Sequence, residues 1–221
     1  DTGDTGDTGD TGDTGDTGTG VVTVSVTELE EGDLIITEVM VDPVDCTSEP
    51  NGEYIEVYNT TEFAVDLKGL KISDAVGTSA AFGTGIMDPG GYAVGIRKGY
   101  ESCYDIDGDF TFSRPLNNGT GDAVTLFTDD ATLDLVDYRG WRVPAGASFE
   151  LDVSAYDTVS NDDELNWCEG VSALGSTTDL GSPGLANDCG AGDTGSSDTG
   201  DTGSADTGTS DTGTEDTGAA D

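Results

Sequence analysis

The sequence predicts an all-β fold for the middle of the chain, and it favours a sandwich of two sheets over a closed barrel. Strand-length runs rich in Val, Ile, Thr and aromatic residues recur about every 10 residues, with Gly, Pro, Asn and Asp between them. No long stretch has the i, i+3, i+4, i+7 apolar spacing of an amphipathic helix. Short strands joined by tight turns most often form sandwiches or barrels.

The predicted strands follow these runs in chain order. The run at 33–41 is the longest, and its pattern predicts a half-buried strand. The sequence LFTDDATLDLV predicts a hairpin that turns at Asp129 and Asp130. The predicted strands are residues 21–26, 33–41, 53–59, 66–74, 91–98, 122–130, 131–140 and 147–153.

Alternation within two of these strands predicts which side chains share a face. In EYIEVYN, Ile55 and Val57 lie on the more apolar face, and Glu56 lies on the other face between two tyrosines. In DLKGLKISD, Leu70 and Ile72 share a face. These apolar pairs are therefore expected in the core.

Both ends of the chain consist of Asp-Thr-Gly repeats, six copies in residues 1–18 and six in 193–218. Neither end contains Lys, Arg, Cys or any apolar residue larger than Ala, so neither buries enough apolar surface to offset the entropy cost of ordering. We expect a disordered linker at 1–20, a folded domain at 21–190 and a disordered tail at 191–221.

The charge balance narrows the possible partners and reactions. The chain has 46 acidic residues, 7 basic residues and no histidine, for a net charge of −39. Phosphate-rich partners are repelled, so nucleic acid is not an expected partner. Without histidine, Ser-His-Asp and Cys-His catalysis and His-containing zinc sites are excluded. No apolar run is long enough to predict a transmembrane segment.

The four cysteines are Cys46, Cys103, Cys168 and Cys189. They form no Cys-x-x-Cys pair, which disfavours a four-cysteine zinc site. An even count in an acidic chain indicates two disulfides formed in an oxidising compartment. Three connectivities are open; we favour Cys168–Cys189 with Cys46–Cys103, and the alternative is four buried thiols.

Asp-Thr-Gly is also the catalytic triplet of aspartic proteases, but a protease needs two copies in buried loops that share a proton. Here every copy has polar or small neighbours, so the repeat is interpreted as a soluble spacer with loose affinity for cations. A sharper calcium candidate is DIDGD, with Asp105, Asp107 and Asp109. Phe110 and Leu116 replace the Gly and Glu of an EF-hand loop, and a solvated loop is the alternative reading.

Other polar and aromatic residues suggest further sites. Trp167 could stack on a sugar, although a packing role is favoured for it and for Trp141. Glu38, Glu53 and Glu56 could supply the two carboxylates of a glycosidase, which must flank a cleft. The strand pattern indicates no such cleft, so the sequence predicts a protein that is not an enzyme.

Six segments in order resemble the lamin-tail domain family. They are GDLIITEVMVDP with Glu38, NGEYIEVYN with Glu53, Glu56 and Asn59, VDLKGLKISD with Leu70 where the family has Trp, MDPGGYAVGIRKG, LNNGTGDAVTLFTDDATLDLVDYRGW and GSPGLAN. The resemblance extends over about residues 30–188 and implies an immunoglobulin-like sandwich that acts as a structural or interaction module without chemistry of its own. The cysteine-containing insertions VDCTSEP and YESCYDIDGD depart from nuclear lamins and favour the bacterial secreted branch.

These observations together predict an extracellular or cell-surface module. Because the chain begins inside a repeat, we expect a mature or trimmed product that is lipid-anchored through a preceding segment. The expected partner is a protein or a cell-envelope component, and the domain is expected to be monomeric. Two alternatives are a calcium- or carbohydrate-binding adhesion module and an accessory domain of a secreted hydrolase. No cofactor is expected apart from calcium at the candidate loop.

Overall fold

The computed structural model describes residues 21–46, 52–82, 84–97 and 104–189, with only the backbone described at 78–81. The expected disordered segments at 1–20 and 191–221 lie outside these residues. The described chain is built from β-strands and four short 3-10 helices, η1 to η4, and contains no α-helix. None of the described helices has the length and apolar character needed to cross a membrane.

The elements follow one another along the chain with short connections. The strands are β1 (Thr23–Ser25), β2 (Leu34–Met40), β3 (Tyr54–Asn59), β4 (Ala64–Asp66), β5 (Lys71–Ser73), β6 (Thr78–Ala81), β7 (Ile86–Met87), β8 (Tyr92–Arg97), β9 (Phe110–Phe112), β10 (Ala123–Phe127), β11 (Thr132–Asp137), β12 (Phe149–Leu151) and β13 (Trp167–Glu169). The 3-10 helices are η1 (Val26–Glu28), η2 (Val153–Ala155), η3 (Ser160–Asp162) and η4 (Glu164–Asn166).

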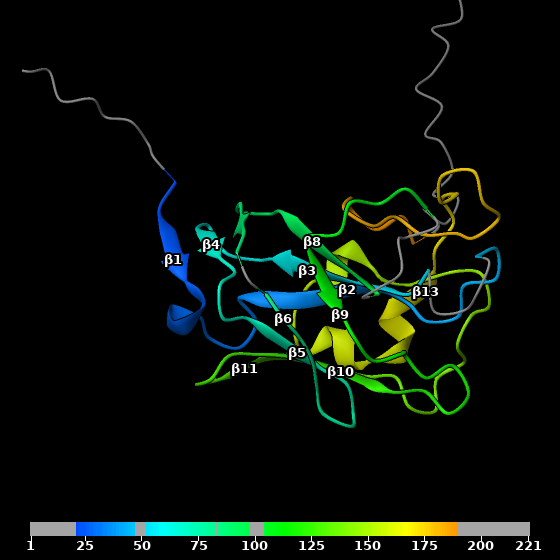
Figure 1. Cartoon of the computed structure of the whole chain (residues 1–221), viewed down its shortest axis with the longest axis horizontal. Helices are drawn as coiled ribbons and strands as arrows, with labels where there is room; N and C mark the ends of the chain where they lie inside the picture. Colours follow the sequence, from blue (N-terminus) through cyan, green and yellow to red (C-terminus); the bar gives the residue numbers. More distant parts are fainter. Residues whose placement is uncertain (1–20, 47–51, 83, 98–103, 190–221) are drawn as a thin grey trace, which may run out of the picture. The chain divides into compact units, whose positions relative to one another are not determined.

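The strands form three sheets, and Figure 1 labels most of their strands. The largest has six strands in the order β13-β12-β2-β3-β8-β9, and a four-stranded sheet has the order β11-β10-β5-β6. A small sheet, β1-β4-β7, completes the set. Most pairs are antiparallel, but β1 pairs with β4 and β8 pairs with β9 in parallel. This arrangement confirms the predicted all-β, immunoglobulin-like sandwich.

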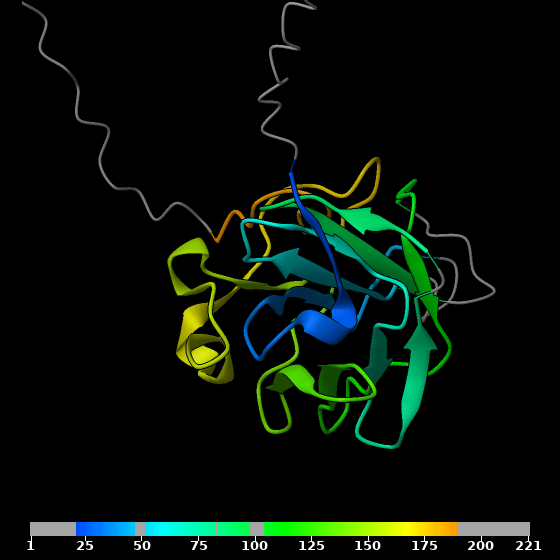
Figure 2. The same ribbon diagram turned by 90° about the vertical axis from the view of Figure 1, so that its left-hand side faces the viewer.

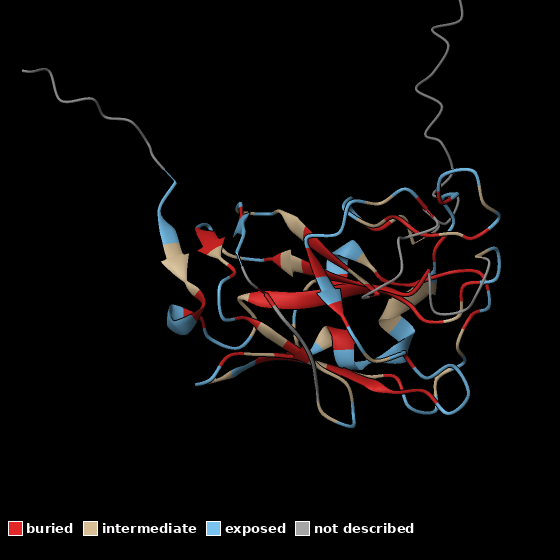
Figure 3. Cartoon of the chain, viewed as in Figure 1, coloured by how far each residue is buried: buried red, intermediate tan, exposed pale blue. Residues whose placement is uncertain are grey.

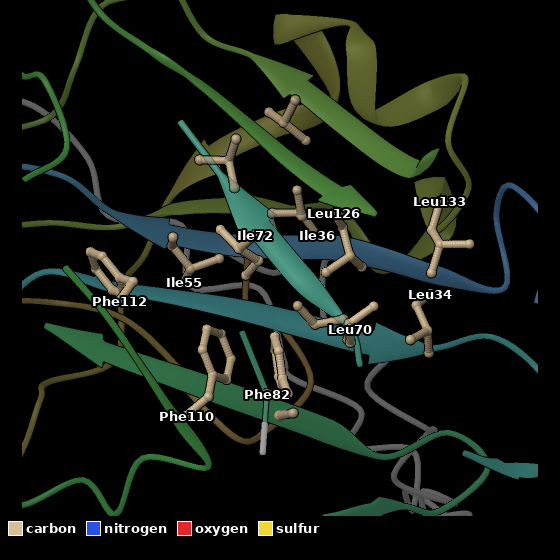
Figure 4. Close-up of a cluster of buried hydrophobic side chains, with 14 of the residues drawn as sticks. Leu34, Ile36, Ile55, Leu70, Ile72, Phe82, Phe110, Phe112, Leu126 and Leu133 are labelled. Carbon is tan, nitrogen blue, oxygen red and sulfur yellow. The ribbon is translucent and has the colours of Figure 1, made fainter. Parts of the chain in front are cut away.

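The main core lies between the two larger sheets (Figure 4). Ile36 and Ile55 from the six-stranded sheet belong to the same buried cluster as Ile72, Leu126 and Leu133 from the four-stranded sheet. Burying side chains of this kind contributes roughly 1.5–3 kcal/mol each. The predicted burial of Leu70 and Ile72 is confirmed, since they are 0% and 1% exposed.

The hairpin predicted at Asp129 and Asp130 is confirmed by the pairing of β10 with β11 and by the bond from Thr128 N to Ala131 O at 2.8 Å. One predicted strand, 66–74, is instead divided into the end of β4 and β5. Gly69 has φ +96° in the turn between them, a left-handed conformation that favours glycine.

The prediction that 33–41 forms a half-buried strand is wrong, because all seven residues of β2 are buried (Figure 3). One face of β2 contacts the main core. The other face is covered by residues from the carboxyl-terminal part of the domain, including Ser182 and Asn187. Periodicity within one strand gives no information about such a distant cover.

Candidate functional site

Three buried glutamates lie side by side on adjacent strands of the six-stranded sheet. Glu150 on β12 is paired in register with Glu38 on β2, and Glu38 is paired with Glu56 on β3. Neighbouring strands are about 4.8 Å apart, so three side chains on one face at the same level form a continuous row. All three glutamates are 0% exposed. We call this set the glutamate row.

Residues 181–189, here called the covering segment, lie over the glutamate row and supply hydrogen bonds from their backbone. Ser182 N donates to Glu38 Oε1 at 2.8 Å, Gly184 N donates to Glu56 Oε2 at 2.6 Å, and Asp188 N donates to Glu150 Oε2 at 2.8 Å. Each glutamate therefore accepts a bond from a different part of the covering segment.

Hydroxyl groups of the sheet add further hydrogen bonds to the row. Glu38 Oε1 also accepts bonds from Tyr54 Oη at 2.5 Å and Ser148 Oγ at 2.7 Å. Glu56 Oε1 accepts a bond from Thr37 Oγ1 at 2.8 Å, next to the irregularity in β2 between Ile36 and Glu38. Neutral donors thus surround the carboxyl groups on both sides.

Close approach of the covering segment depends on a glycine. A Cβ atom added at Gly181 would lie 2.1 Å from Tyr54 Oη and 2.7 Å from Glu38 Oε1. Neither atom has room to move away, because both belong to buried side chains that bond to each other. Only glycine therefore lets the backbone pass this close to the row.

Two further contacts fix the covering segment to the sheet. The Asn187 side chain donates from Nδ2 to Thr37 O at 2.7 Å and to Leu151 O at 2.8 Å. A disulfide joins Cys168 on β13 to Cys189, with a Cα–Cα distance of 5.3 Å, as the sequence predicted. Cys168 on β13 is paired in register with Glu150 on β12, so the disulfide lies one strand beyond the glutamate row.

Burial raises the pKa values of all three carboxyl groups. Desolvation is the main cause for each: it raises the pKa of Glu38, raises that of Glu56 well above its ordinary value and raises that of Glu150 to about 8. The charge of Glu38 adds to the shift at both neighbours. Burial therefore shifts all three carboxyl groups toward their protonated, neutral form.

The covering segment limits the reactions in which the glutamate row could take part. A glycosidase pair needs a cleft that admits sugar and water between two carboxyl groups, whereas the row is covered by the backbone of 181–189. Glu53 is separate from the row: it accepts a bond from Leu116 N at 3.2 Å and lies 4.0 Å from Arg97 Nε. The arrangement favours a structural role for all of these acids.

Among the described residues, one group of three potential metal ligands has its ligand atoms within 4.8 Å of one another, namely Glu150, Cys168 and Cys189. Because the two sulfurs are bonded to each other, they offer no thiolate to a metal. The calcium candidates Asp105, Asp107 and Asp109 are exposed and do not form such a group.

The DIDGD segment that contains these calcium candidates nevertheless has defined local geometry. Asp109 Oδ2 accepts a bond from Val94 N at 2.8 Å, which ties the end of the loop to β8. Asp105 has φ +59°, in the left-handed region. Calcium binding by this loop stays a prediction. So does the second predicted disulfide: Cys46 is disulfide-bonded, but Cys103 lies outside the described residues.

Both tryptophans occupy packing positions. The ring centroids of Trp141 and Trp167 are 5.8 Å apart, and Trp141 also packs edge-on against Phe149. Trp167 Nε1 donates to Asn161 O at 2.8 Å. These contacts favour the packing role over a platform for sugar.

Sequence reasoning missed most of the residues that surround the row. Ser148 and Glu150 lie in a predicted strand, and Ser182 and Asn187 lie in the GSPGLAN motif, but none was selected as a site residue. The signal available was the unusual coincidence of acidic residues inside apolar strands. Finding their common partner required knowledge of which strands pair.

Comparison with known proteins gives one match. The family model described as Lamin Tail Domain matches residues 28–142 of the chain. No curated protein and no solved structure matches the chain. The covering segment lies beyond the matched residues, although its GSPGLAN sequence resembles the family's ending.

Proposed function

Because the chain belongs to the lamin tail domain family, we propose that it is a non-enzymatic module displayed outside the cell or on its surface, where it binds a protein or cell-envelope partner. The family supports a structural or interaction role for the immunoglobulin-like domain. The display function and the location are the parts of this proposal that go beyond the family.

The closure of the glutamate row is the observation that best supports a structural role. The most catalyst-like acids, Glu38, Glu56 and Glu150, are fully buried and bonded to the backbone of the covering segment. Reaching them would require residues 181–189 to leave the sheet. A binding partner has to use the outer surface of the domain instead.

The disulfide and the composition support the proposed location. Cys168–Cys189 is a bond that persists in oxidising compartments. The Asp-Thr-Gly repeats on both sides of the domain provide Gly for flexibility and Asp for solubility. In the proposal they act as spacers that hold the domain away from a surface, with a lipid anchor before the first spacer.

The location can be tested on the native protein. Medium, cell surface and cytosol are separated in the presence of an alkylating reagent that reacts with every free thiol, and the protein is then analysed by mass spectrometry without reduction. The proposal predicts recovery from the surface or medium, a lipid on an amino-terminal extension and no alkylated cysteine. Recovery from the cytosol with four free thiols would contradict the proposed location and display.

A further inference from the structure

The small sheet ends in an open edge. β1 is its outermost strand, and no described strand pairs with the side of β1 that faces away from β4. Val22 O accepts a bond from Ala64 N at 2.9 Å, and Thr23 lies opposite Ala64. Backbone groups of successive strand residues point to opposite edges, so the N–H and C=O of Thr23 point outward.

β1 is nevertheless firmly attached to the domain. Val24 packs against the main core, and Val26 in the following η1 is 1% exposed. Ser25 begins η1 with a capping box in which Ser25 N donates to Glu28 Oε2 at 2.9 Å. An open edge held in place in this way offers a preformed template for another strand.

Exposed apolar side chains surround this edge. Val21 and Val22 are 58% and 59% exposed, and Phe63, next to the start of β4, is 45% exposed. Figure 2 shows β1, in blue, crossing the side of the domain that faces the viewer.

A groove of about 330 Å³ lies beside β1, and its charged residues are all acidic. Val24, Leu29 and Phe63 supply apolar lining, and Glu28, Asp33 and Glu62 supply carboxylates. The first basic residue of the whole chain is Lys68. The edge and groove therefore combine unpaired backbone groups, apolar surface and negative charge.

We propose that the β1 edge is a docking site for an extended, basic segment of a partner protein, which adds a strand beside Thr23 and places Lys or Arg side chains against the groove. Main-chain bonds would supply affinity, and the apolar and acidic residues would supply selectivity. This inference rests on the proposed function, since it names the surface through which the module binds its partner.

The negative charge of the groove favours a basic partner segment over two other possible occupants of the β1 edge. A second copy of the chain would bring the same carboxylates, Glu28, Asp33 and Glu62, to the contact, and like charges oppose that pairing. The Asp-Thr-Gly repeat that precedes β1 carries only negative charge and has no apolar side chain to place beside Phe63. A basic and apolar strand satisfies all three features of the edge.

The test uses the full chain and a capped octapeptide of alternating Lys and Val as the probe. Binding is measured by fluorescence anisotropy, and hydrogen exchange of the Thr23 amide is followed by NMR. We expect saturable binding that weakens with added salt, together with slowed exchange at Thr23. A peptide in which Pro replaces Val keeps the charge but cannot pair as a strand, so it is expected to bind much more weakly.

Two matched variants locate the site. Glu62→Lys and Asp130→Lys each reverse one exposed acidic residue, but only Glu62 lines the groove. An exposed charge pair contributes up to about 1 kcal/mol, so loss of the Glu62 charge in Glu62→Lys should weaken binding by up to roughly five-fold, and Asp130→Lys should have a much smaller effect. Thr23→Pro removes the outward N–H and should reduce binding further.

Three results would overturn the inference: equal binding of the Lys-Val and Lys-Pro peptides, unchanged exchange at Thr23, or equal effects of the two charge reversals. A dimer whose formation depends on Thr23 would instead assign the edge to a second copy. The location experiment is independent of this one, because a cytosolic protein that binds the Lys-Val peptide would contradict only the display function.

Discussion

The three carboxyl groups of the glutamate row have only hydroxyl and backbone N–H groups among the hydrogen-bond donors described for them. Burying an ionised carboxylate without a cation is costly, and three in a row would also repel one another. Protonation removes both costs, in line with the raised pKa values of all three carboxyl groups. The stabilising effect of the row should therefore depend on pH.

Glu150→Gln tests this dependence. The pKa of Glu150 is raised from 4.5 to about 8, so the folded state binds its proton more tightly than the unfolded state does. This stabilisation is fully present below about pH 4.5 and is lost as the pH rises to about 8. We expect the melting temperature of the parent protein to decrease as the pH is raised from about 4.5 to about 8, and to decrease less steeply in Glu150→Gln. Calorimetry at several pH values would measure both slopes.

Glu62→Gln is the control for that experiment, because Glu62 is exposed and its carboxyl group is solvated in both the folded and unfolded states. This variant should keep the pH dependence of the parent protein. Asp134, whose pKa burial raises to about 7, contributes in the same direction as Glu150 and leaves some slope in every variant. Identical slopes in Glu150→Gln and Glu62→Gln would contradict the role assigned to the row.

Asn187→Ala tests the attachment of the covering segment at a single side chain. The substitution removes two donors that reach the backbone oxygens of Thr37 and Leu151 inside the fold. Leaving buried polar groups without partners costs about 1–3 kcal/mol of unfolding free energy, which urea denaturation would measure. Asn118→Ala, at an exposed position, should cost less than about 0.5 kcal/mol; equal losses would exclude a special role for Asn187.

At the scale of elements, the disulfide holds one end of the covering segment beside β13. The bond closes a loop with a sequence separation of 21, for which chain entropy predicts a contribution of about 3 kcal/mol. The double variant Cys168→Ser, Cys189→Ser should lose about that amount. Hydrogen exchange at Ser182 and Gly184 should increase more than at Ile36, because the covering segment is released before the sheet opens.

An equal increase in exchange throughout the domain would show that the disulfide stabilises the whole fold and not one segment. The second predicted pair is kept intact in this experiment, since Cys46 is unchanged.

The elements also show what a single sequence can predict. The alternation of EYIEVYN and the turn at Asp129 and Asp130 are local signals, and both corresponding elements are present. The parallel pairing of β1 with β4 depends on a contact across about 40 residues and has no local signal. Predicting the glutamate row would have required contacts over a still longer separation, because Ser148 and Glu38 are 110 residues apart in sequence.

For the whole molecule, the dominant property is a net charge of −39. Self-repulsion at this charge opposes the compact state, and salt screens it over about 8 Å at physiological ionic strength. We expect the melting temperature of the full chain to rise as sodium chloride is added. Potassium chloride at the same ionic strength should have the same effect, and a melting temperature that falls with salt would contradict this account.

Calcium separates general screening from specific binding. Calcium chloride is compared with sodium chloride at matched ionic strength, in the parent chain and in Asp107→Ala. An additional rise with calcium that Asp107→Ala removes would support the predicted site at Asp105, Asp107 and Asp109. Equal effects of the two salts would exclude a specific site there.

The covering segment also has a consequence for the order of events during synthesis. The bond from Ser182 N to Glu38 joins residues 144 apart, so one face of β2 stays open until nearly the whole domain has left the ribosome. Long-range closures of this kind slow folding. The same order applies to the disulfide, because Cys168 can pair with Cys189 only after the covering segment has been synthesised.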